Sequence, residues 1–238
     1  MKKRIISLAI FSIAMGFFEA VVVVYLRQLY YPEGFAFPLK PMALEGFCIE
    51  FLREVSTLIM LVSLGLVAGQ TFSERLACML YSFGIWDIFY YVWLKVMLDW
   101  PQSLLTWDIL FLVPVAWAGP VLAPILCAFT MVAIGICILY LQDRAHQTGI
   151  SFLEWMVLSL GGLAIFSSFI WEYTKIMIQG GFISRFLSLG RDPQFQNAIA
   201  RHIPDSYNWF LFALGECMIL CFLMMLCRKA SSHRTPSL

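Results

Sequence analysis

Long apolar stretches alternate with short polar ones along most of the 238-residue chain. Six of these stretches reach or approach the ~20 residues that an α-helix needs to cross the ~30 Å hydrocarbon layer of a bilayer. The pattern predicts an all-α fold, a single membrane-embedded domain in which about six transmembrane helices form a bundle. The predicted spans cover residues 5–26, 43–69, 76–98, 121–141, 152–178 and 209–226.

One apolar stretch, residues 109–141, is too long for a single span. As one helix it would measure about 50 Å at ~1.5 Å per residue. Pro114 and Pro120 would interrupt such a helix, because each lacks an N–H and crowds the preceding turn. We therefore expect a span from 121 to 141, preceded by a short re-entrant or interfacial helix around 109–119. If that short segment crossed the membrane, the number of spans would change.

Composition agrees with a membrane protein, since 61% of the residues are hydrophobic and only 13% are charged. Soluble domains carry about 25% charged residues. The net charge of +1 and the absence of a long basic run argue against nucleic acid as a partner. The seven cysteines form no CxxC pair, and we interpret them as small buried hydrophobes.

Basic residues predict the orientation of the bundle. They cluster at both ends of the chain, at residues 2–4 and at Arg228, Lys229 and Arg234. Because short cytoplasmic segments are enriched in Lys and Arg, both termini are predicted to lie in the cytoplasm, with the bundle in the plasma (inner) membrane. The first apolar run is longer than the 7–15 residues typical of a signal-peptide core, so we interpret it as a retained span.

Several ionisable side chains fall at membrane depth. A charge at the bilayer centre costs at least ~2.5–3.5 kcal/mol, so such residues generally face the bundle interior and are paired. They converge on the half of the bundle predicted to be outer. The residues are Glu19, Glu50, Arg53, Glu54, Asp87, Glu172 and Glu216.

Sequence spacing predicts which of these residues share a helix face and how deep one of them lies in the membrane. Glu50, Arg53 and Glu54 are three and four residues apart, so they share one helix face. The planar fork of Arg53 could hold two carboxylates. Asp87 lies about 16 Å from the predicted cytoplasmic end of its span, near the midplane, and is therefore the predicted titrating group.

A weak repeat links three of the predicted spans. In each, an acidic residue directly follows an aromatic one, and a basic residue comes three or eight positions later. The pairs are Glu19 with Arg27, Asp87 with Lys95, and Glu172 with Lys175. The repeat indicates either three related hairpins that place acids at a shared centre, as in many transporters, or coincidence in an aromatic-rich sequence.

Three functions fit these charges. The first is a small-solute or ion/proton-coupled carrier with an acid-rich cavity open to the outer face, lined by Asp87, Glu19, Glu54, Arg53, Glu172 and Glu216, with Glu50, Arg27, Lys95 and Lys175 in secondary roles. The second is a non-catalytic membrane subunit or assembly factor, in which the charges clamp helices together or dock partner subunits. The third is a membrane enzyme acting on a lipid or quinone.

An enzyme is the less favoured class, because the sequence offers no recognisable catalytic residues. The three histidines lie outside the predicted spans, and neither an HExxH nor a GxSxG motif is present. We therefore predict no metal site and no cofactor. Between the last two spans, residues 182–189 and 194–202 are predicted to form short amphipathic helices.

Overall fold

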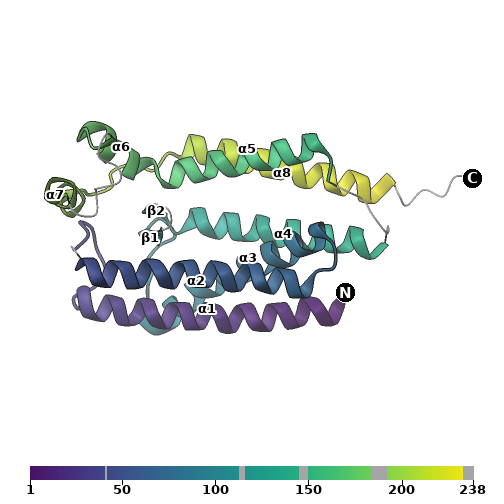
Figure 1. Ribbon diagram of the computed structural model, residues 1–238, viewed down its shortest axis with the longest axis horizontal. Coiled ribbons are helices and arrows are strands. Elements are labelled where there is room, and N and C mark those ends of the chain that lie inside the picture. The colour runs from purple at the N-terminus through teal and green to yellow at the C-terminus, as the bar shows by residue number, and fades with distance from the viewer. Residues whose placement is uncertain (41, 113–115, 145–149, 184–191, 233–238) are drawn as a thin grey trace, which may run out of the picture.

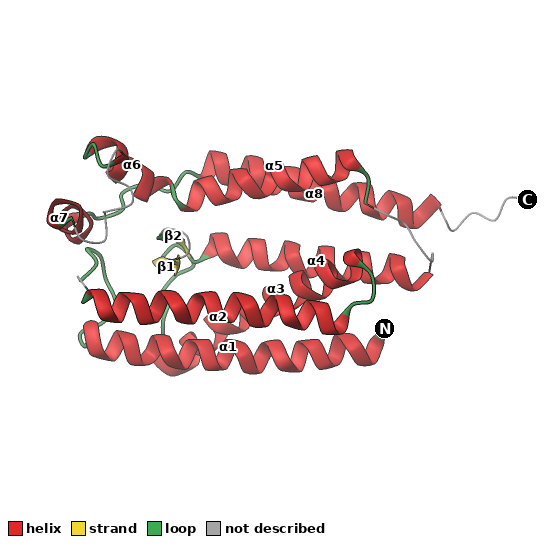
Figure 2. Cartoon of the chain, in the orientation of Figure 1, coloured by secondary structure: helices red, strands yellow, loops and turns green. Residues whose placement is uncertain are grey.

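The computed structural model describes residues 1–40, 42–112, 116–144, 150–183 and 192–232. Six helices in these ranges are long and apolar enough to cross a membrane, which confirms the prediction of a multi-pass α-helical bundle. They lie roughly parallel along the long axis of the molecule (Figures 1 and 2). Their bounds are α1 Lys2–Tyr30, α2 Leu44–Ala68, α3 Phe72–Leu98, α4 Leu122–Arg144, α5 Phe152–Phe169 and α8 Trp209–Ser232.

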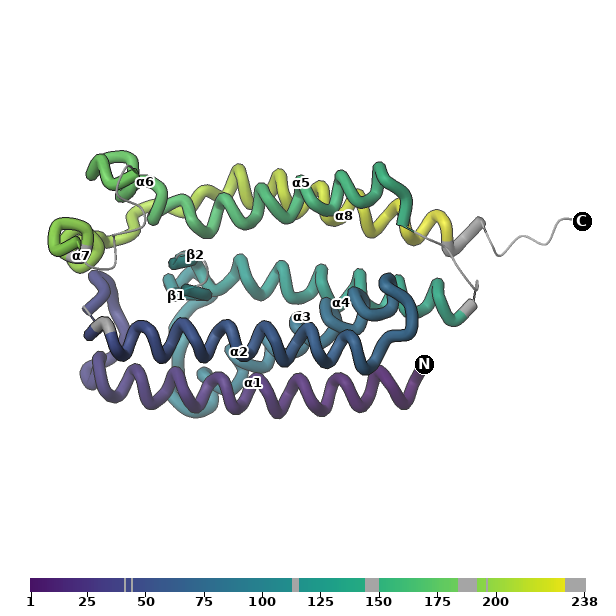
Figure 3. The backbone as a smooth tube through the Cα atoms, in the orientation of Figure 1, coloured from purple at the N-terminus to yellow at the C-terminus, as the bar shows by residue number. Residues whose placement is uncertain are grey.

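The bundle has two distinct ends. The N-terminus and the end of α8 lie at one end, which we call the terminal end (Figure 3). The smaller elements gather toward the other, which we call the hairpin end (Figure 1). These elements are β1 Trp107–Phe111, β2 Trp117–Pro120, α6 Trp171–Gln179 and α7 Pro193–Arg201. In the predicted orientation, the hairpin end is the outer one.

The segment before α4 is a β-hairpin and not the short helix expected around 109–119. Trp107 pairs with Pro120 and Asp108 pairs with Gly119 in an antiparallel register. Because the two strands run in opposite directions, the segment returns toward the end from which it came and adds no span. Aromatic and β-branched residues favour strands, and pairing of the two strands satisfies the backbone N–H and C=O groups that face each other.

The predicted span over residues 152–178 is wrong as a continuous helix. Helix α5 ends at Phe169, and the separate helix α6 begins at Trp171. The hydroxyls of Ser167 and Ser168 bond to the carbonyls of Leu163 and Ile165, a pattern that often bends helices. Farther along the chain, α7 confirms the helix predicted over 194–202, whereas most of 182–189 lies outside the described residues.

Contacts between helices define a curved row, α2–α3–α4–α8–α5, with α1 packed on α3. Two joints of this row need glycine. A Cβ on Gly135 of α4 would lie 2.8 Å from the carbonyl oxygen of Ala77 on α3. A Cβ on Gly161 of α5 would lie 3.0 Å from the carbonyl oxygen of Gly215 on α8. Small residues thus bring the backbones together, as is common in membrane bundles.

Ion pairs fasten the terminal end. Glu154, in the first turn of α5, is 1% exposed and accepts a 2.5 Å hydrogen bond from Lys229 near the end of α8. Arg4 of α1 pairs with Glu74 of α3 at 2.8 Å. These contacts hold neighbouring helices together at the terminal end of the bundle.

Candidate functional site

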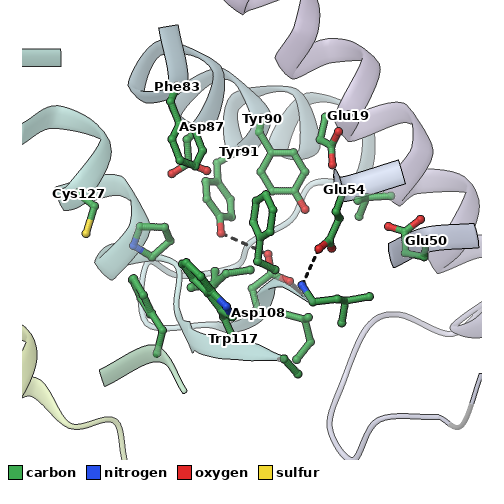
Figure 4. Close-up of a pocket in the computed structure, with 18 of the residues that line it drawn as sticks. Glu19, Glu50, Glu54, Phe83, Asp87, Tyr90, Tyr91, Asp108, Trp117 and Cys127 are labelled. Atoms are coloured by element: carbon green, nitrogen blue, oxygen red, sulfur yellow. Dashed lines mark hydrogen bonds between the residues drawn. The ribbon is translucent and has the colours of Figure 1, made fainter. Parts of the chain in front are cut away.

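A cavity of about 790 Å³ lies within the curved row of helices. All six long helices, the β-hairpin and the short helices α6 and α7 contribute to its wall. Figure 4 shows carboxylates and aromatic rings from α1, α2, α3 and the hairpin gathered at this cavity. The volume lies in the range of 300–1,000 Å³ that is typical of small-molecule sites.

Four charged side chains from α1 and α2 form the first part of the wall, and we call them the Arg53 cluster: Glu19, Glu50, Arg53 and Glu54. The Arg53 guanidinium donates to Glu50 on its own helix and to Glu19 on α1. Glu54 lies farther away, with 3.9 Å between its carboxylate and Arg53. The predicted role of the Arg53 fork in holding two carboxylates is therefore confirmed.

A second group, the Arg27 cluster, consists of Arg27, Tyr91 and Asp108. Arg27 donates to Asp108 at 3.0 Å, and the Tyr91 hydroxyl donates to the other carboxylate oxygen at 3.3 Å. The guanidinium also stacks 3.7 Å above the ring of Trp100. Burial raises the pKa of Asp108 to about 6, although Arg27 and Tyr91 act to lower it.

The two clusters meet at the hairpin. The carboxylate of Glu54 accepts a 2.7 Å hydrogen bond from the backbone N–H of Leu112, directly after β1 (Figure 4). Asp108 lies on β1 itself. The hairpin is thus attached to two helices. Glu54 of α2 binds the residue after β1, and Asp108 of β1 binds Arg27 of α1.

Asp87 differs from these acids. It lines the cavity from α3, and within the described ranges it has no hydrogen-bond or ion-pair partner. Glu216 on α8 also lines the cavity, and one of its carboxylate oxygens is buried without a hydrogen bond among the described residues. These two groups retain free capacity to bind a proton, a cation or a hydrogen-bond donor.

The structure brings together most of the predicted site residues but not all of them. Glu19, Glu50, Arg53, Glu54, Asp87, Glu216 and Arg27 line the cavity. Lys95 lies away from it, paired at 2.8 Å with the exposed Asp99. Glu172 and Lys175 pair with each other on α6 and are outside the cavity wall. Glu172, which was predicted to line the cavity, therefore lies outside its wall, as do Lys95 and Lys175, for which secondary roles were predicted.

Glu172 belongs to a separate contact at the hairpin end. It is 4% exposed, and its carboxylate binds Lys175 at 2.6 Å and His202 at 2.8 Å. His202 directly follows α7, so this contact ties α6 to the segment after α7. The break of the predicted fifth span at Ile170 explains the difference, because it removes Glu172 from the bundle axis.

The most important residue that the sequence did not identify is Asp108. It follows a tryptophan in a segment that reads as a polar loop, and only the β-hairpin carries it inward beside Arg27. Tyr90, Tyr91 and Trp117 also line the cavity. Aromatic residues are so frequent in this chain that no pattern distinguishes these three from those at the membrane interface.

Metal binding has no evident ligand set in this part of the molecule. Among the described residues, no group of three His, Cys, Asp or Glu side chains is placed to hold a metal ion.

Comparison of the chain with protein-family models, with curated proteins and with solved structures gives no match. The function must therefore be argued from the cavity and its own residues.

Proposed function

We propose that this multi-pass membrane protein is a carrier that takes a small solute into the cavity from the hairpin end and couples its passage to protonation of Asp87. The observation that carries the proposal is the isolation of Asp87. It lies about 16 Å along α3 from the hairpin-end terminus of that helix, deeper than Glu216, and faces the cavity without a partner among the described residues.

A purely structural role accounts for the other acids better than for Asp87. The Arg53 and Arg27 clusters bridge different elements, and each has an arginine paired with one or more acids. An unpaired carboxylate at membrane depth costs several kcal/mol and fastens nothing. A role in transport would explain why this unfavourable carboxyl group is present, because it could take up and release a proton beside a bound solute.

The outer surface supports a carrier over a docking subunit. Large apolar side chains are exposed along the long helices, as at Ile10 on α1 and Leu52 and Val67 on α2. Such a surface suits lipid tails. Exposed charged residues, such as Arg75 and Lys95, lie near the ends of their helices, whereas the charges in mid-helix line the cavity, where a partner helix packed on the outside would not meet them.

Two measurements test the proposal. With Asp87→Cys in sealed vesicles of known orientation, a charged methanethiosulfonate added at the hairpin end should label position 87, as identified by peptide mass spectrometry. In proteoliposomes that contain a pH-sensitive dye, a panel of amino acids, inorganic cations and organic amines should include a solute that drives proton movement. That movement should be lost in Asp87→Asn and kept in the exposed variant Asp99→Asn.

The outcomes separate the three functional hypotheses. Solute-driven proton movement that persists unchanged in Asp87→Asn would overturn the coupling role. A cavity that binds a lipid or quinone and releases a chemically altered product would favour the enzyme. An unlabelled position 87 together with stable co-purifying membrane subunits would favour the assembly role.

A further inference from the structure

The wall of the cavity changes character along the bundle. Every charged residue in the wall lies at the level of Asp87 or closer to the hairpin end. Toward the terminal end, the wall continues on four helices with mainly apolar side chains, and the hydroxyl of Thr130 there is bonded to carbonyls of its own helix. The apolar residues are Leu76, Leu80 and Phe83 on α3, Met131 and Ile134 on α4, Leu158 on α5, and Ile219 on α8.

This arrangement gives the cavity two halves of different chemistry. From Leu76 to Tyr91 it extends over roughly 22 Å of α3, at ~1.5 Å per residue. A small hydrophilic solute would use only the half nearer the hairpin. The apolar half offers such a solute no hydrogen bonds, so an occupant that fills both halves must itself be amphipathic.

The polar half carries an excess of negative charge. Of the described residues, six acids line the cavity against three bases, Arg27, Lys40 and Arg53. The two arginines are already paired with acids. Asp87 and one oxygen of Glu216 remain available, and the rings of Tyr90, Tyr91 and Trp117 stand in the same wall. Acids and aromatic faces together are the groups that bind an ammonium ion.

The helix row is not closed on one side of the cavity, and we call this side, between α2 and α5, the mouth. The two ends of the row, α2 and α5, both line the cavity, yet within the described ranges they do not pack closely against each other. Gly162 lies on the α5 side, where an added Cβ would meet no atom within 4 Å. A molecule dissolved in the bilayer could therefore reach the cavity between α2 and α5 without crossing the aqueous phase.

From these observations we propose that the solute is a cationic amphiphile. Its basic head lies among Asp87, Glu216 and the aromatic rings, and its apolar tail lies in the half lined by Leu80 and Ile134. It enters from the lipid between α2 and α5, in the half of the bundle nearer the hairpin end, so that entry from the hairpin end proceeds through the bilayer at that end. This inference rests on the proposed carrier function and specifies its substrate class.

Photo-crosslinking tests where the tail lies. The probe is an alkyltrimethylammonium with a twelve-carbon chain and a diazirine at the tail end, added to the native protein in phosphatidylcholine nanodiscs. Crosslinks should map to Leu80 and Ile134. Excess dodecyltrimethylammonium should compete for this labelling, whereas the same amount of uncharged dodecanol should not. In Asp87→Asn, labelling at the subsaturating probe concentration should fall about tenfold.

A matched pair of variants tests the route. Gly162→Phe fills the α5 side of the mouth and should abolish crosslinking at Leu80. Leu163→Phe adds the same ring one residue later, at a side chain that is 59% exposed and outside the cavity wall, and should leave it unchanged. Gly162→Ala keeps the mouth open and should label normally. Elution of each variant as a single species on gel filtration shows that a loss of labelling is not unfolding.

The two proposals fail differently. Crosslinks confined to lipid-facing residues, equal competition by dodecanol, or normal labelling in Gly162→Phe would each overturn the cationic amphiphile. Asp87-dependent proton movement driven by short hydrophilic solutes would then still support the carrier. Charge-dependent crosslinks at Leu80 without proton movement would support the binding site and overturn the carrier.

Discussion

Glu54 on α2 accepts a hydrogen bond from the backbone N–H of Leu112, 58 residues farther along the chain. The bond is 2.7 Å long and ends on the residue that follows β1. The bond is partly buried at the cavity, and a buried backbone N–H that loses its partner costs free energy. A side chain of a long helix therefore supplies the acceptor for the residue after β1 and attaches the hairpin to α2.

Replacing Glu54 should loosen this attachment. Glu54→Ala leaves the Leu112 N–H without an acceptor, and we expect a loss of about 1–3 kcal/mol in the free energy of unfolding. Glu54→Gln keeps an acceptor oxygen and should lose less. The melting temperature and amide hydrogen exchange at Leu112 measure the two effects. Equal exchange in all three proteins would show that the bond does not hold the hairpin.

Removing the cation of the Arg53 cluster should be more damaging than removing one of its acids. Arg53→Met leaves Glu19 and Glu50 facing each other without a counter-charge, at an expected cost of about 3–5 kcal/mol. Adding Glu19→Gln and Glu50→Gln to that variant should recover much of the loss. Thermal unfolding in detergent gives the comparison. A single Arg53→Met variant as stable as the native protein would contradict the pairing described above.

Two neighbouring glycines of α5 should respond in opposite ways to the same substitution. Gly161→Leu forces a side chain against the backbone of α8 and should separate the two helices, with a clear fall in melting temperature. Gly162→Leu places the same side chain in open space, so its effect should stay within about 0.5 kcal/mol. If both variants melt alike, close backbone contact between α5 and α8 is not what stabilises this pair.

The buried Asp108 should make stability depend on pH. Its pKa is raised to about 6, so its neutral form favours the folded state, and this contribution is lost as the pH rises through about 6. The native protein should therefore lose more stability between pH 5 and pH 7.5 than Asp108→Asn, whose amide stays neutral. Melting temperatures at the two pH values test this. The opposite sign would mean that pairing with Arg27 outweighs burial.

The comparison of sequence with structure has a physical pattern. The spans were predictable because apolar length is a property of each segment alone, and the Arg53 cluster was predictable in part because Glu50 and Arg53 share a helix turn. The burial of Asp108 was not, because it depends on the pairing of residues 107–111 with 117–120 and on Arg27, 81 residues away. Glu172 was misplaced because α5 ends at Phe169, next to two serines whose hydroxyls bond to helix carbonyls, and Glu172 belongs to the separate helix α6.

The close glycine contacts divide the bundle into two leaves. One contains α1 to α4, locked at Gly135, and the other contains α5 and α8, locked at Gly161. The leaves join along the seam where α4 meets α8, with β2 touching both beside it. A change in the width of the mouth would then require the two leaves to rotate as rigid bodies about this seam. Asp87 and Glu216 lie on different leaves, so the distance between their carboxylates would report the angle between the leaves.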